Sequence, residues 1–120
     1  MDLVRALGIC DKEEYKTGPC AKPELLKSFH TADYIAVLKK TEVSQKISEK
    51  DAKTYNIGSL SNPVFPEMFK RPATSVGSSL LAADLVANGG RAYSLGGCLH
   101  HGMAGYANGF CFLNDLAFAI

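Results

Sequence analysis

Two adjacent histidines, His100 and His101, lie in residues 92–114, a stretch that contains no Lys, Arg, Asp or Glu. Imidazole gains and loses a proton near neutral pH, and two neighbouring imidazoles can act as a general base and its polarising partner. Glycine lets the backbone approach a ligand closely, and the same stretch holds Gly96, Gly97, Gly102, Gly105 and Gly109. We therefore expect proton-transfer chemistry in a site whose apolar walls include Phe110 and Phe112.

Three other interpretations of this stretch stay open at this point. The two histidines could be ordinary polar loop residues, one of them hydrogen-bonded to a carbonyl group. They could bind a metal ion, although adjacent side chains in extended backbone point in opposite directions and do not easily reach one ion. Cys111 could be a nucleophile paired with a histidine, although the phenylalanines beside it favour a buried, unreactive thiol.

The composition excludes several classes of protein. The chain has 120 residues, enough for one core, and its net charge of +1 gives no reason to expect a nucleic-acid partner. It lacks 18 consecutive apolar residues and a signal peptide, so we expect no membrane span and a cytoplasmic location. The four cysteines, at positions 10, 20, 98 and 111, form no CxxC pair, which favours reduced thiols over a zinc site.

The spacing of apolar residues predicts the helices that must position the uncharged stretch around His100 and His101. Tyr34, Ile35 and Leu38 share one face of a helix that begins near residue 31 or 32. Residues 67–88 predict a mostly buried helix that ends at a glycine. Its predicted buried face consists of Val76, Leu80, Ala83 and Ala87. Residues 39–53 predict a solvated helix or loop, and residues 55–66 an irregular loop with two prolines.

A strand and a last helix are predicted on either side of the histidines. Residues 91–95 read as a short buried strand, and residues 114–120 as a helix with Asn114 or Asp115 near its N-cap. The order helix, strand, loop, helix predicts an α/β fold with a parallel sheet, and ligands bind beyond the carboxyl ends of such strands. We expect His30 to cap or pack a helix end, and Asp33 and Asp115 to favour helix starts.

Three segments, in order, resemble a known family. Residues 96–115 (GGCLHHGMAGYANGFCFLND), residues 29–38 (FHTADYIAVL) and residues 62–69 (NPVFPEMF) are similar to motifs of the zinc-dependent histone deacetylase superfamily. The resemblance extends over residues 23–120, and NPVFP favours the acetoin-utilization branch. It implies an arginase-like three-layer α/β fold that uses zinc to hydrolyse acyl amides, with N-acetyl-lysine or small acetylated amines as substrates.

The same resemblance implies a role for each residue of the loop. His101 would be the general base that later protonates the leaving amine, with His100 as its electrostatic partner. Phe110 would form a wall of the substrate tunnel, and Gly109 would present its backbone at the rim. Residues 1–120 would be the N-terminal part of a single deacetylase-like domain. Its zinc ligands would lie downstream, so this chain would hold none and would be inactive alone.

Three positions depart from the family pattern, and two alternatives to a catalytic deacetylase stay open beside it. Ser61 stands where relatives commonly have a substrate-gripping aspartate, which bears on peptide-substrate binding, Cys98 replaces a glycine, and Gly102 replaces an alanine. One alternative is a non-catalytic protein of the same fold that binds acyl-lysine or a small ligand. The other is an unrelated α/β protein with an incidental pair of histidines.

Overall fold

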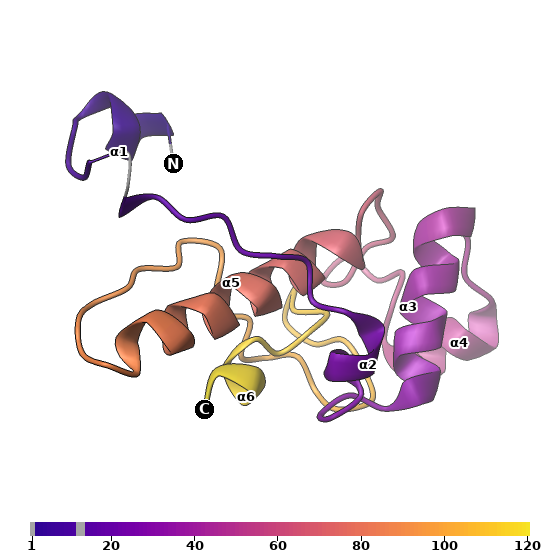
Figure 1. The fold of residues 1–120 in the computed structure, drawn as a ribbon. Coiled ribbons are helices and arrows are strands. Elements are labelled where there is room, and N and C mark those ends of the chain that lie inside the picture. Colours follow the sequence, from indigo (N-terminus) through magenta and orange to yellow (C-terminus); the bar gives the residue numbers. More distant parts are fainter. Residues whose placement is uncertain (1, 12–13) are drawn as a thin grey trace.

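The structure of this chain is a computed structural model that describes residues 2–11 and 14–120. Its fold consists of helices joined by long loops (Figure 1). The helices are α1 (Asp2–Ala6), α2 (Pro23–Leu26), α3 (Ala32–Ser44), α4 (Glu49–Tyr55), α5 (Lys70–Val86) and α6 (Leu116–Ala119). Within the described ranges no helix is both long and apolar enough to cross a membrane. The histidines lie in the long loop between α5 and α6.

Helix α3 forms where the sequence predicts it. Its buried residues, Tyr34, Ile35, Leu38 and Thr41, recur every three or four positions and so lie on one face. The helix ends at Gln45, whose φ of 52° is left-handed and whose N–H donates to the carbonyl of Thr41. Asp33 lies exposed in the first turn, as expected of an acidic residue at a helix start.

Helix α5 also forms, but its predicted buried face is wrong over the second half. Val76 is fully buried, Leu80 and Ala83 are half-buried, and Ala87 is exposed. The residues that pack on α5 cover its first half, where the carbonyl of Ala73 accepts the N–H of Ala21 at 2.9 Å. Beyond Ala83 the apolar side chains of Leu85 and Val86 are covered only in part, with 49% and 39% of their surface exposed.

The buried strand predicted over residues 91–95 is absent. These residues run as an exposed coil in which Tyr93 is 89% exposed. A buried strand needs neighbouring strands for its N–H and C=O groups, and residues 2–11 and 14–120 form no strand at all. The parallel sheet is therefore not seen in the part of the chain that the structure describes, where pairing is limited to an isolated antiparallel bridge between Asn108 and Cys111.

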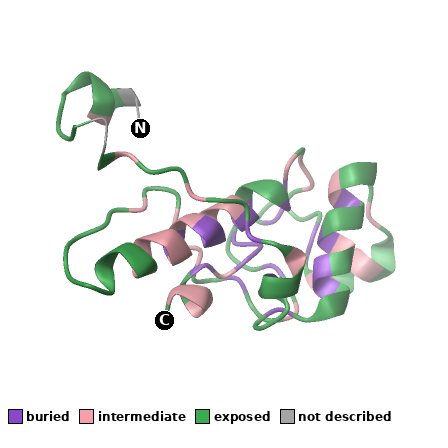
Figure 2. Ribbon diagram, viewed as in Figure 1, coloured by how far each residue is buried: buried purple, intermediate pink, exposed green. Residues whose placement is uncertain are grey.

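One hydrophobic core joins α3 and α5 to the loop that follows the histidines (Figure 2). Its fully buried members include Leu26, Tyr34, Ile35, Leu38, Ile57, Met68, Ala73, Val76, Ala107 and Leu113. The hydroxyl of Tyr34 donates to the carbonyl of Phe112 at 2.7 Å, and burial raises the pKa of this hydroxyl. The core thus fixes the end of the loop, residues 107–113, against the helices.

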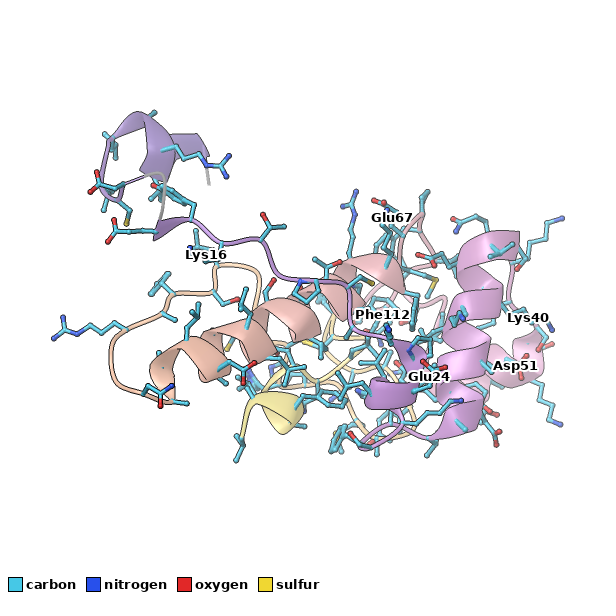
Figure 3. All side chains as sticks on the ribbon, viewed as in Figure 1. Lys16, Glu24, Lys40, Asp51, Glu67 and Phe112 are labelled. Atoms are coloured by element: carbon cyan, nitrogen blue, oxygen red, sulfur yellow. The ribbon has the colours of Figure 1, made fainter. Side chains whose placement is uncertain are left out.

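Most charged side chains lie at the surface; Asp115, which is fully buried, is an exception. Figure 3 shows Phe112 in the interior, whereas its labelled charged residues lie at the surface: Lys16, Glu24, Lys40, Asp51 and Glu67. Helix α4 buries no residue and begins at Ser48, whose hydroxyl accepts the N–H of Asp51 at 3.1 Å. The prediction of a solvated helix or loop over residues 39–53 is confirmed. Residues 56–66 are irregular, also as predicted.

Candidate functional site

The two histidine rings lie side by side on a turn. Their centroids are 4.1 Å apart with the ring planes tilted by 44°, and both residues are exposed. The N–H of Gly102 donates to the carbonyl of Leu99 at 3.3 Å, which closes a turn around His100 and His101. Extended backbone would separate the two side chains, but this turn brings their rings into contact on the same side.

The surroundings of the two rings differ. Nδ1 of His100 lies 3.2 Å from the carbonyl oxygen of Cys98 and 3.4 Å from its Sγ, so this ring is tied to its own loop. The described residues place no hydrogen-bond partner on the ring of His101. A ring with both nitrogens accessible can exchange a proton with a bound molecule.

Gly109 and Phe110 lie at the tip of a tight turn beside His101. Asn108 and Cys111 exchange backbone hydrogen bonds of 3.1 and 2.8 Å, and the two residues between them have φ of 51° and 63°, as in a type I′ turn. A Cβ on Gly109 would lie 3.1 Å from Cβ and Cγ of His101. The histidine therefore packs directly on glycine backbone, while Phe110 stands 69% exposed next to it.

Asn62 holds Phe110 in this left-handed conformation, a role that nothing in the sequence indicates beyond the family-like segment in which Asn62 stands. Its Oδ1 accepts the N–H of Phe110 at 3.0 Å, and its Nδ2 donates to the carbonyl of Asn56 at 3.0 Å. The side chain is completely buried. A left-handed φ costs an L-residue about 1–2 kcal/mol, and these contacts offset part of it.

A hollow of about 280 Å³ adjoins the turn, between the loop and the start of α5. It is lined by Pro63, Phe65, Arg71, Pro72, Ser75, Leu99, Phe110 and Phe112. Leu99, which directly precedes the two histidines in the chain, belongs to this lining. The structure brings together His100, His101, Gly109 and Phe110 at one end of the loop, with the imidazoles outside the hollow itself.

Asp115 fixes the start of the histidine turn. Its carboxylate is fully buried and accepts the N–H of Cys98 at 2.9 Å, the N–H of Leu99 at 2.6 Å and the hydroxyl of Ser79 at 2.5 Å. A Cβ on Gly97 would lie 2.8 Å from this carboxylate, so the backbone passes too close for a larger residue. Asp115 flanks α6 as expected, but its side chain makes no cap bond.

Asn114 and His30 fix the rest of the loop. Asn114 Oδ1 accepts the N–H of Ala117 at 3.1 Å, which caps α6 as predicted, and its Nδ2 donates to the carbonyls of His100 and Gly102 at 3.2 and 2.9 Å. The buried ring of His30 accepts the N–H of Asn114 through Nε2 at 3.1 Å, and its Nδ1 donates to the carbonyl of Met103 at 3.0 Å.

His30 is therefore a neutral structural histidine, in agreement with the expectation that it packs rather than catalyses. The rings of Phe29 and Tyr34 lie 4.9 and 5.8 Å from it. Burial lowers the pKa of His30 below its ordinary value, while hydrogen bonds to the carbonyls of Ala104 and Met103 act in the opposite direction. The two ring nitrogens need one proton between them, because one donates and the other accepts.

In the part of the chain that the structure describes, the remaining chemically active side chains do not assemble a further centre. Cys111 is buried, with Sγ 3.5 Å from the carbonyl of Gly109, as expected of an unreactive thiol. Cys98 is exposed, and its φ of 73° explains why a glycine suits that position. Across residues 2–11 and 14–120, no three His, Cys, Asp or Glu side chains come close enough to hold a metal ion.

Comparison with known proteins identifies the family. The model of the histone deacetylase domain matches residues 1–120. The acetoin utilization protein AcuC of Bacillus subtilis is 38% identical over 121 residues, which cover 99% of this chain and 31% of that protein. AcuC of Staphylococcus aureus strain N315 is 39% identical over 118 residues, covering 97% of this chain and 30% of that protein.

Solved structures agree with the sequence relatives. An HDAC homolog from Aquifex aeolicus matches with a TM-score of 0.91 and 34% identity, over 97% of this chain and 31% of that chain. A second structure, an HDAC homolog complexed with SAHA, has the same TM-score, identity and coverage. The chain thus spans about 31% of the length of these relatives. With the family model matched along its whole length, the chain belongs to the histone deacetylase family, on its acetoin-utilization branch.

Proposed function

We propose that this chain supplies the acid–base pair and one tunnel wall to a zinc-dependent deacetylase that hydrolyses acyl amides, with N-acetyl-lysine or small acetylated amines as substrates. The observation that carries the proposal is the contact between the paired imidazoles and the glycine–phenylalanine turn: His100 and His101 lie 4.1 Å apart, and His101 packs on Gly109 beside Phe110. Proton-transfer groups and an apolar wall thereby face one side of the loop.

In this proposal His101 performs both proton transfers. It takes a proton from the water that attacks the amide carbonyl, as the new C–O bond forms. It then gives this proton to the amine nitrogen as the C–N bond breaks, which leaves a carboxylic acid and a free amine. His100, held by Cys98, stabilises charge on its neighbour. Phe110 packs against the aliphatic chain of the substrate, which contributes binding through buried apolar area.

The described residues do not fit zinc by themselves, because they bring no three potential ligands together. This chain spans 31% of the AcuC protein of Bacillus subtilis, which leaves about 69% (100% − 31%) unmatched. We propose that the zinc ligands lie in the part of the whole protein that corresponds to this remainder. Residues 1–120 would then be the N-terminal part of one arginase-like, three-layer domain with a parallel sheet. The family match over the same residues supports this view.

The test is acetate release by the purified whole protein. N-Acetyl-lysine peptides and small acetylated amines are offered in parallel, before and after a chelator treatment followed by zinc addition. The proposal predicts turnover of at least one class, loss of turnover with the chelator and recovery with zinc. Saturable binding of these compounds without any acetate release would contradict it and would support the non-catalytic alternative.

A further inference from the structure

We infer that the consecutive residues Asn114 and Asp115 are positioning residues for the histidine pair. Asp115 holds the backbone before the pair, and Asn114 holds the backbone around it. The inference rests on the proposed function, because acid–base catalysis requires the imidazoles to be kept in one orientation toward the substrate.

Asp115 acts on the two N–H groups that precede His100. Each carboxylate oxygen accepts one of them, from Cys98 at 2.9 Å and from Leu99 at 2.6 Å, and the hydroxyl of Ser79 on α5 donates to the same oxygen as Cys98. An ionised acceptor makes hydrogen bonds about twice as strong as a neutral one. Because this carboxylate is fully buried, the bonds tie the start of the turn to the rigid helix.

Asn114 acts on two carbonyl groups of the turn. Its amide nitrogen donates to the carbonyl of His100 at 3.2 Å and to that of Gly102 at 2.9 Å, on either side of His101. His30 fixes the backbone of Asn114 in turn, through the bond of 3.1 Å from its N–H to Nε2. Two adjacent side chains thus bind four backbone groups between residues 98 and 102.

This arrangement explains how His101 is oriented although the described residues put no hydrogen bond on its ring. The direction of the ring follows from the backbone on both sides and from its contact with Gly109. A misplacement of a catalytic group by about 1 Å can cost roughly 10²-fold in rate. Loss of the Asp115 or Asn114 contacts should therefore appear in kcat more than in KM.

The experiment uses two conservative variants of the whole protein. Asp115→Asn keeps the shape of the side chain but replaces one acceptor oxygen with an NH2 group. This group cannot accept the hydrogen bond that a backbone N–H or the hydroxyl of Ser79 donates to Asp115. Asn114→Asp keeps an oxygen for the cap of α6 but removes the donor to the carbonyls of His100 and Gly102. Each should lower kcat about 10-fold to 10²-fold with little change in KM. The control is Ser44→Ala, which removes an exposed hydrogen bond to the carbonyl of Lys46 at the end of α3, away from the histidine turn, and should leave kcat unchanged.

A second comparison separates positioning from general destabilisation. When His101→Ala is already present, Asp115→Asn should cause no further loss of kcat, because the two residues act on one step. A milder variant, Ser79→Ala, removes one of the three donors to Asp115 and should lower kcat several-fold, whereas Ser78→Ala on the same helix should not. Equal further losses in the His101→Ala background would overturn the inference.

Side-chain NMR of the imidazoles separates this inference from the proposed function. Asp115→Asn should shift or broaden the ring signals of His100 and His101, and Ser44→Ala should not. If the parent protein hydrolyses no acyl amide but the signals respond in this way, positioning holds and the proposed function fails. If the parent is active and neither the signals nor kcat respond to Asp115→Asn or Ser79→Ala, positioning fails and the function stands.

Discussion

Replacing His30 with leucine should strongly destabilise the fold, since this one ring connects two parts of the loop that carries His100 and His101. Leucine keeps the apolar packing against Phe29 and Tyr34 but removes both ring nitrogens. The N–H of Asn114 then loses its acceptor, and the carbonyl of Met103 loses its donor. His30 is only 1% exposed, so water cannot readily replace the lost nitrogens.

The magnitude follows from these two contacts. A buried donor left without an acceptor costs about 1–3 kcal/mol, and the carbonyl of Met103, in an exposed residue, adds about 0.5–1.5 kcal/mol. The free energy of unfolding should fall by about 2–4 kcal/mol. With a urea m-value of roughly 2 kcal/mol/M, the midpoint of unfolding falls by about 1–2 M. The measurement is urea unfolding followed by far-UV circular dichroism.

The pH dependence provides an independent check of the same reasoning. Burial lowers the pKa of His30 from its ordinary value of 6.5, so the folded state favours the neutral ring. Its contribution to stability is complete above pH 6.5 and is lost as the pH falls below 6.5 toward the folded-state pKa. His30→Leu should remove this part of the pH dependence. His100→Leu, at an exposed histidine, should change stability by less than about 0.5 kcal/mol. A His30→Leu protein as stable as the parent, with the same pH dependence, would refute the reasoning.

Three further changes test the geometry of the loop and its support. Cys98→Gly should raise the free energy of unfolding, measured in urea, by about 0.5–1 kcal/mol. Glycine relieves the left-handed φ of Cys98, which costs about 1–2 kcal/mol, and this gain exceeds the added entropy of the unfolded chain, about 0.4–1 kcal/mol. A less stable variant would contradict this. Gly77→Ala should lower the melting temperature and speed proteolysis near Pro19, because the new Cβ would lie 1.7 Å from the carbonyl oxygen of Pro19; an unchanged melting temperature would speak against that contact. Phe110→Ala should raise KM for N-acetyl-lysine peptides more than it lowers kcat, because it removes apolar wall; a loss confined to kcat would exclude the wall role.

The elements that depend on local spacing were predictable from the sequence. Tyr34, Ile35 and Leu38 predict α3 because a helix face recurs every three or four residues. The absence of a strand at residues 91–95 was not predictable in this way, since a short apolar run becomes a strand only beside other strands. Ala87 was misplaced for a related reason, because helical periodicity shows which residues share a face but not whether anything covers it.

The candidate site was predictable to a different degree. Glycine density and the absence of charge drew attention to His100 and His101, and the family resemblance added Gly109 and Phe110; their catalytic and binding roles stay predictions. The supporting contacts could not be read from spacing. His30 and Asn114 are 84 positions apart, and Asn62 and Phe110 are 48 positions apart. Such hydrogen bonds depend on how the chain returns to itself, which no local pattern encodes.

The most direct test of the central claim compares His101→Ala with His100→Ala in the whole protein. On a substrate that the parent hydrolyses, His101→Ala should lower kcat by about 10²- to 10⁴-fold, since it removes the group that both accepts and returns the proton. His100→Ala should cost less, and the metal content of both variants should match that of the parent. A His101→Ala protein with kcat near that of the parent would contradict the account and leave the pair as ordinary loop residues.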